Sequence, residues 1–175
     1  MKVTEREYEQ SKVITFSNTK GQYGGLSNMA PGYSLFVNEV IIPNSECLYQ
    51  ACRFPLFPDI QQKIIEQKSP IDAKNISRKH DHLTRQDWDQ VKFNVMQWCL
   101  MVKLVQNWDS FGSLLGSTGD KLIVEYSTKD KVWAATPAGT NKLVGVNALG
   151  RLLMDIRQKH ILNNDKPLLV KPLNI

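Results

Sequence analysis

The segment Ser45–Phe54, with the sequence SECLYQACRF, constrains what this chain can fold into more than any other segment. As a helix it places Glu46, Gln50 and Arg53 on one stripe, because residues three and four apart share a face. The opposite side is apolar and can face a core. A carboxylate, an amide and a guanidinium in one row are unfavourable inside a core, because buried polar groups without partners cost free energy. The segment therefore predicts a helix with one face packed inward and the other lining a polar ligand site.

The composition is that of a globular protein with a mildly basic surface. Of the 175 residues, 42% are hydrophobic and 22% are charged, which excludes a wholly disordered chain. The net charge of +5 favours an anionic partner such as a nucleotide or nucleic acid, although scattered lysines and arginines are equally typical of a solvated surface. Residues 1–10 do not have the pattern of a signal peptide, and no segment is apolar enough to span a bilayer. We therefore expect a cytoplasmic protein without a membrane partner.

The chain length indicates one domain, which we place at residues 1–162, followed by a proline-containing tail at residues 163–175. Hydrophobic periodicity and turn signals predict its elements. Strands are expected at 12–17 and 122–126, a hairpin at 33–42 with its turn at Asn38–Glu39, and further helices at 59–67, from residue 70, and at 84–107, 109–115 and 147–159. Thr84 and Asp87 have the spacing of a capping box for the long helix, and residues 78–83 are expected to form a basic linker.

Acidic residues are the best candidates for chemistry. Glu46 shares its stripe with polar residues, Glu125 stands inside an apolar strand, and Asp130 follows in a loop. Two acids across a cleft can break a glycosidic bond, one acting on the leaving group and the other on water or on the cationic sugar. Structural salt bridges would explain each acid singly. Trp133, three residues after Asp130, can stack on a base or sugar, or can simply hold its loop in place.

The segment Gly145–Gly150 opens the last predicted helix. Free N–H groups at this helix start, with Asn147 as its cap, would favour a phosphate. The alternative is an ordinary cap together with a close packing contact at the glycines. Three cysteines without a CxxC pair indicate reduced thiols, and His80 and His82 do not form a metal-binding signature. We expect no metal ion and no cofactor.

Taken together, these short motifs resemble the NADAR (YbiA-like) family, and they occur in that family's order from about residue 14 to residue 158. The matching positions are Phe16, Leu26-Ser27-Asn28, Ser45-Glu46, Gln50-Ala51, Arg53-Phe54, Ser69-Pro70, Ala73-Lys74, Asp87-Trp88, Met96, Lys103, Thr118-Gly119-Asp120, Glu125, Asp130, Trp133, Gly145, Asn147, Leu149-Gly150, Leu153-Met154 and Arg157.

The resemblance implies an α+β fold, a predominantly helical single domain with a small antiparallel sheet. It also implies N-glycosidase chemistry on ribose-linked substrates, with the site between the helix at Glu46 and the Asp130–Trp133 loop. Glu46 and Asp130 would be catalytic. The residues implied in substrate binding are Phe16, Ser27, Asn28, Gln50, Arg53, Lys103, Thr118, Gly119, Glu125, Trp133, Gly145 and Asn147.

The resemblance leaves three functions open. In the first, the chain removes ADP-ribose from guanine in DNA or other nucleic acid, as an antitoxin whose genetic partner is an ADP-ribosyltransferase toxin. In the second, it hydrolyses phosphorylated intermediates of riboflavin biosynthesis. In the third, it binds ADP-ribose or another NAD derivative without turnover. The family's histidine after Glu46 is Cys47 here, and its usual lysine is Arg53, which stays protonated and cannot form a Schiff base. Arg53 could still bind an anion, and Lys103 is then the next amine to consider.

Overall fold

The computed structural model describes residues 4–167 and residue 170, and these residues divide into two compact units. The first unit comprises residues 4–27 and 108–167, and the second comprises residues 28–107 with residue 170. Each unit is described by itself. The tail predicted at residues 163–175 lies largely outside the described residues.

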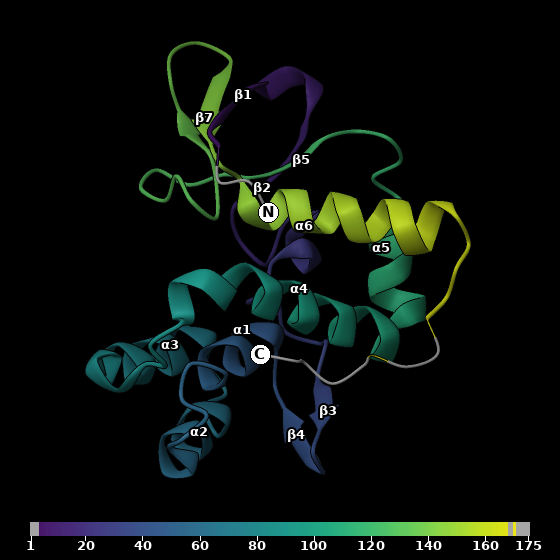
Figure 1. Cartoon of the computed structure of the whole chain (residues 1–175). Coiled ribbons are helices and arrows are strands. Elements are labelled where there is room, and N and C mark those ends of the chain that lie inside the picture. Colours follow the sequence, from purple (N-terminus) through teal and green to yellow (C-terminus); the bar gives the residue numbers. More distant parts are fainter. Residues whose placement is uncertain (1–3, 168–169, 171–175) are drawn as a thin grey trace. The chain divides into compact units, whose positions relative to one another are not determined.

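The second unit is a group of helices with one hairpin (Figure 1). Its elements are β3 (Leu35–Val37), β4 (Val40–Ile42), α1 (Ser45–Ala51), α2 (Pro58–Ile65), α3 (Pro70–Lys79), a 3₁₀ turn at Asp81–Leu83, and α4 (Trp88–Gln106). The helices α1, α2 and α3 pack against one another, and α1 also contacts α4 and β4. All residues of α1 are buried, which explains why polar residues on this helix need partners.

Local signals account for the starts of the first three helices. The side chain of Asn44 accepts a hydrogen bond from the backbone N–H of Cys47 and so caps α1. Pro58 occupies the first turn of α2, and the side chain of Ser69 accepts from the N–H of Asp72 at the start of α3. These predicted helix starts are confirmed. α3 continues to Lys79, so the expected basic linker is shorter than predicted.

The hairpin is confirmed, with Asn38 and Glu39 both at positive φ, as a two-residue type I′ turn requires. The side-chain amide of Gln106, at the end of α4, donates to the carbonyl of Phe36 and accepts from its N–H, at 2.8 and 2.7 Å. The predicted capping box of α4 is wrong. Thr84 accepts a hydrogen bond from Arg53 instead, and Asp87 makes no side-chain cap bond.

The first unit combines small sheets with the last helix. Its elements are β1 (Arg6–Glu9), β2 (Ile14–Phe16), a 3₁₀ turn at Gly24–Leu26, a π-helical turn at Trp108–Gly112, α5 (Ser113–Gly116), β5 (Ile123–Glu125), β6 (Thr136–Pro137), β7 (Lys142–Gly145), α6 (Ala148–Ile156) and a π-helical segment at Arg157–Leu162. β1, β7 and β6 form an antiparallel sheet, β2 pairs with β5 in parallel, and α6 packs against β5.

The α+β class is confirmed, and the strands at 12–17 and 122–126 lie where the sequence predicts them. The expectation of one small antiparallel sheet needs correction, because the described strands form three separate sheets and one of these is parallel. The sequence analysis also missed β1, which is charged and buries only Tyr8. Within the described residues no helix combines the length and apolarity that crossing a bilayer would need.

Candidate active site

Glu46 lies at the centre of a buried polar cluster in the second unit. Its side chain is 3% exposed, and both of its oxygens accept hydrogen bonds. Asn28 donates its side-chain N–H to Oε2, and Gln50 donates to Oε1 at 2.8 Å. The backbone N–H of Glu46 also donates to the carbonyl of Asn28, which fixes the two residues against each other. Each carboxylate oxygen retains a second lone pair for a ligand or a water molecule.

Burial raises the pKa of Glu46 above its ordinary value of 4.5. Lys74 and Arg78 on α3 oppose this change through their positive charges, and the amide donors of Gln50 and Asn28 oppose it through hydrogen bonds to the charged form. Desolvation is the largest effect, so the pKa lies above the usual glutamate range. A carboxyl group with a raised pKa can exchange protons closer to neutral pH, as a general acid or base must.

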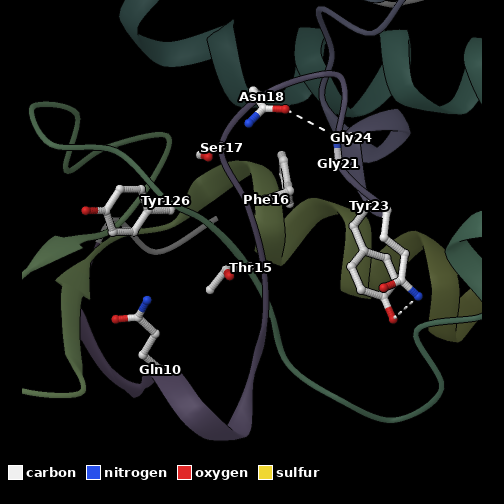
Figure 2. A pocket seen from close by; sticks show the side chains of 10 residues that line it. Gln10, Thr15, Phe16, Ser17, Asn18, Gly21, Tyr23, Gly24 and Tyr126 are labelled. Atoms are coloured by element: carbon white, nitrogen blue, oxygen red, sulfur yellow. Dashed lines mark hydrogen bonds between the residues drawn. The ribbon is translucent and has the colours of Figure 1, made fainter.

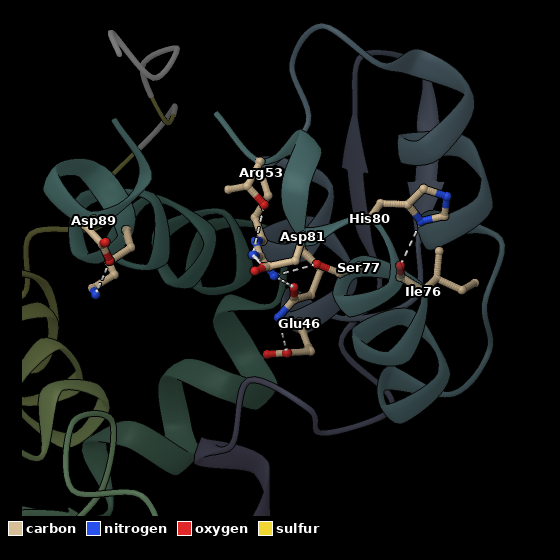
Figure 3. Close-up of polar contacts among 10 residues, drawn as sticks. Glu46, Arg53, Ile76, Ser77, His80, Asp81 and Asp89 are labelled. Atoms are coloured by element: carbon tan, nitrogen blue, oxygen red, sulfur yellow. Dashed lines mark hydrogen bonds and ion pairs between the residues drawn. The ribbon is translucent and has the colours of Figure 1, made fainter. Parts of the chain in front are cut away.

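Arg53 lies just beyond the end of α1, and its guanidinium donates hydrogen bonds to side chains of the second unit. Figure 3 shows its guanidinium beside Ser77 and Asp81. Nη1 donates to Ser77 at 2.8 Å, and Nη2 donates to Asp81 and to Thr84. Nη1 also reaches Oε1 of Gln50 at 3.4 Å. This contact orients the Gln50 amide so that its NH₂ group faces Glu46, and Arg53 therefore acts on the carboxylate through Gln50.

Lys103 is buried on α4, with 1% of its side chain exposed. Its ammonium nitrogen lies 4.3 Å from the centroid of the Tyr33 ring. Burial lowers the pKa of Lys103 well below that of an exposed lysine. The predicted role of Lys103 in substrate binding is not tested by this geometry, and it stays a prediction.

The predicted phosphate site at the start of α6 is wrong in its premise. The N–H groups of Val146, Asn147, Ala148 and Leu149 donate to carbonyl groups of the loop at residues 131–134. Because these four donors are already bonded and their residues are buried, none of them is free to bind a phosphate. Asn147 does not act as the predicted cap either. Its side chain donates to the carbonyl of Ile123 and accepts from the N–H of Glu125, and so joins α6 to β5.

Close packing explains the two glycines of this segment. A Cβ on Gly145 would lie 2.4 Å from the carbonyl oxygen of Ala134, and one on Gly150 would lie 2.2 Å from that of Ile123. The packing alternative stated for these glycines is therefore confirmed.

Asp130 and Trp133 are joined by local hydrogen bonds. Oδ1 of Asp130 accepts from the backbone N–H groups of Val132 and Trp133, at 2.8 and 2.9 Å. The carbonyl of Trp133 accepts from Leu149 at the start of α6. The carboxylate of Asp130 therefore stabilises the turn that leads to Trp133. Both side chains are half-buried, and their predicted roles in catalysis and binding stay predictions.

The other predicted residues of the first unit lie in the β2–β5 pair, in the turn after α5 and at the end of the 3₁₀ turn. Phe16 and Glu125 are paired positions in the parallel strands β2 and β5. Thr118 is buried, donates to the carbonyl of Leu115 and accepts from Arg157, while Gly119 takes a left-handed conformation at φ +51°. Ser27 is the C-terminal cap of the 3₁₀ turn at Gly24–Leu26, and its backbone N–H donates to the carbonyl of Gly24.

A cavity of about 430 Å³ opens beside Phe16. Figure 2 shows that residues of β2 and the following glycine loop line it, with Tyr126 from the chain beyond β5. Its lining combines Phe16, Tyr23 and Tyr126 with short polar side chains such as Ser17 and Asn18. Aromatic rings with polar neighbours suit a flat, hydrogen-bonding ligand such as a nucleobase.

The structure brings together Glu46, Gln50 and Arg53, as the helical stripe predicts, and adds Asn28 from the loop after the 3₁₀ turn. Glu46 and Asp130 belong to different units, and their action on one bond stays a prediction. Sequence reasoning missed Tyr23 and Tyr126 in the cavity and did not assign Lys74 and Arg78 to the surroundings of Glu46. The spacing of Lys74 and Arg78, one helical turn apart, is the signal that could have found them.

Comparison with known proteins places the chain in a family. The family model described as NADAR domain matches residues 15–160. The N-glycosidase YbiA of Escherichia coli is 32% identical over 150 residues, which are 86% of this chain and 89% of that protein. An N-glycosidase of Nostoc punctiforme is 33% identical over 148 residues, 83% of this chain and 91% of that protein.

A riboflavin biosynthesis protein of Vibrio vulnificus is also similar, with 32% identity over 146 residues. The match covers 83% of this chain but only 38% of that protein, so the chain spans well under half of its length. Among solved structures, the NMR structure of E. coli YbiA superimposes with a TM-score of 0.74 and 29% identity, over 90% of this chain and 89% of that chain. The chain therefore belongs to the NADAR domain family, together with N-glycosidases of the YbiA type.

Proposed function

We propose that this chain is an N-glycosidase that hydrolyses the bond between ADP-ribose and a guanine base in nucleic acid. The observation that carries the proposal is the buried carboxylate of Glu46, held by the amides of Asn28 and Gln50 and raised in pKa by burial. Membership in a family with N-glycosidases supports the reaction class. The net charge of +5 supports a polyanionic substrate.

In the proposed reaction, Glu46 acts on the ribose side of the bond. Its charged form takes a proton from water as the water attacks the anomeric carbon, or stabilises the positive charge that develops on the sugar. The carbon–nitrogen bond breaks, the guanine leaves with the bonding electron pair but stays in the nucleic acid, and it takes up the proton that the attacking water gives up. The two amide donors hold the carboxylate in one orientation, which lowers the cost of organising the site during the reaction.

A second substrate class has an observation in its favour. Relatives named as riboflavin biosynthesis proteins occur in Vibrio vulnificus and in maize, at 32% and 31% identity. On this alternative the same carboxylate would act on a phosphorylated intermediate of riboflavin biosynthesis. Both alternatives use the same site and differ in the leaving group.

The test is a direct comparison of substrates. The purified chain is incubated with DNA carrying ADP-ribosylated guanine and, separately, with phosphorylated riboflavin-pathway intermediates, and the released products are separated by chromatography. We expect free ADP-ribose and unmodified guanine in DNA. Turnover of the riboflavin intermediates alone would replace the proposed substrate by the second one. Binding of ADP-ribose without any release would identify a binding module.

The aromatic cavity of the first unit is expected to bind a nucleobase such as the adenine of ADP-ribose. Replacing Tyr126 by alanine removes one ring from its lining and should weaken ADP-ribose binding by about 1–3 kcal/mol, the usual contribution of a stacked base. The measurement is titration calorimetry, with Phe36→Ala as the control, since Phe36 is an exposed ring on the hairpin. Equal affinity of Tyr126→Ala and the control would exclude this cavity as the base site.

A further inference from the structure

Two cations on α3, Lys74 and Arg78, act on the buried carboxylate of Glu46. They are four residues apart and so lie on one face of the helix. α3 packs against α1, which carries Glu46. The positive charges of both residues favour the ionised carboxylate, with Lys74 the stronger of the two. Lys74 is half-buried and Arg78 is exposed.

Neither cation has an acidic partner at short range. In the part of the chain that the structure describes, Lys74 and Arg78 take part in no ion pair and no side-chain hydrogen bond. Arg53, Arg85 and Lys92 in the same unit are each paired with an aspartate. A lysine and an arginine whose charges reach one carboxylate but which contact no acid can still bind an anion from solution.

We propose that Lys74 and Arg78 bind the phosphate that the substrate carries on its ribose, and that this contact places the N-glycosidic bond beside Glu46. The inference rests on the proposed function, and both substrate classes named there carry phosphate. ADP-ribose has a diphosphate on its 5′ oxygen, and the riboflavin-pathway intermediates are phosphorylated. At the α6 start, for which the sequence predicts a phosphate site, the N–H groups of residues 146–149 are bonded within the chain.

The chemistry of the two side chains fits this role. The guanidinium of Arg78 can bind two phosphate oxygens at once, while the ammonium of Lys74 supplies a compact charge closer to the carboxylate. A 5′ phosphate lies only a few bonds from the anomeric carbon, so a phosphate held here keeps that carbon near Glu46. Binding energy from a part of the substrate that does not react would thereby position the part that does.

The experiment measures binding without turnover. ADP-ribose and ribose 5-phosphate are each titrated into the wild type, Lys74→Ala, Arg78→Ala and Lys79→Ala, at low and at high salt. Lys79 is the matched control, because it is an exposed cation on the same helix that is not among the groups acting on Glu46. We expect Lys74→Ala and Arg78→Ala to weaken both ligands roughly tenfold or more, as for lost charged hydrogen bonds. Lys79→Ala should stay within about twofold of the wild type.

A second readout separates this role from a purely structural one. Both variants should raise KM and also lower kcat, because a bond that is no longer held beside Glu46 reacts more slowly at saturating substrate, while their melting temperatures should stay near that of the wild type. A loss confined to ribose 5-phosphate would support the phosphate site and reject ADP-ribose as its source. Affinities within twofold of the wild type for both ligands would overturn the proposal. Since these affinities need no hydrolysis, an absence of ADP-ribose release from modified DNA would count against the proposed function alone.

Discussion

Glu46→Gln is expected to reduce turnover about 100-fold or more while raising the melting temperature at neutral pH. The substitution keeps the size of the side chain and removes the charge that acid–base catalysis needs. It also removes a buried carboxylate whose pKa is raised in the folded chain. The contribution of Glu46 to stability is therefore fully present below the ordinary value of 4.5 and is lost as pH rises through the folded pKa. Glutamine does not titrate and avoids this loss.

Thermal melting at pH 4 and pH 7, together with initial rates, checks both parts of this prediction. The gain in melting temperature should be present at pH 7 and small at pH 4. Glu66→Gln is the matched control, because Glu66 is an exposed carboxylate in the same unit. That variant should keep both its rate and its melting temperature. Near-normal turnover by Glu46→Gln would remove Glu46 from the chemistry.

Arg53→Ala is expected to cost about 2–3 kcal/mol of unfolding free energy, the scale of lost hydrogen bonds to a charged group. The guanidinium joins the end of α1 to Ser77 on α3, to Asp81 and to Thr84 before α4. Its removal leaves the buried hydroxyl of Ser77 without this donor. Arg53→Lys should lose less, since an ammonium can keep one of these contacts but not the fork. Chemical denaturation of both variants gives the comparison.

Arg85→Ala serves as the control for a local ion pair. Arg85 binds Asp87, two residues away, and its loss disconnects no helices, so a smaller effect is expected. Unchanged stability of Arg53→Ala would contradict this structural role and favour the ligand contact that the sequence predicts for Arg53. In that case Arg53→Ala would unfold at the wild-type denaturant concentration and would lose affinity for ADP-ribose.

Much of the fold follows from local signals. The caps Asn44 and Ser69, the proline at the start of α2 and the Asn38–Glu39 turn act over a few residues, and the structure agrees with each. The stripe of Glu46, Gln50 and Arg53 could also be predicted, because helical spacing alone brings these side chains together.

The errors arise where a distant partner competes for a side chain. Asn147 stands where a cap is expected, but β5 lies close enough to take both ends of its amide. Thr84 is likewise bound by Arg53 from another part of the chain. β1 was missed because its partner strand β7 follows more than 130 residues later, and polar residues alternate too weakly there to reveal a strand. Local propensity cannot report such contacts.

The pH dependence of kcat/KM in the wild type and in Asn28→Ala tests the role of Glu46 most directly. Asn28 donates a hydrogen bond to the charged carboxylate, so its removal should raise the pKa of Glu46 further. We expect the activity of the wild type to fall as pH drops through a midpoint above 4.5, and Asn28→Ala to move this midpoint to higher pH. A midpoint at or below 4.5, or one that is the same in both proteins, would contradict this role of Glu46.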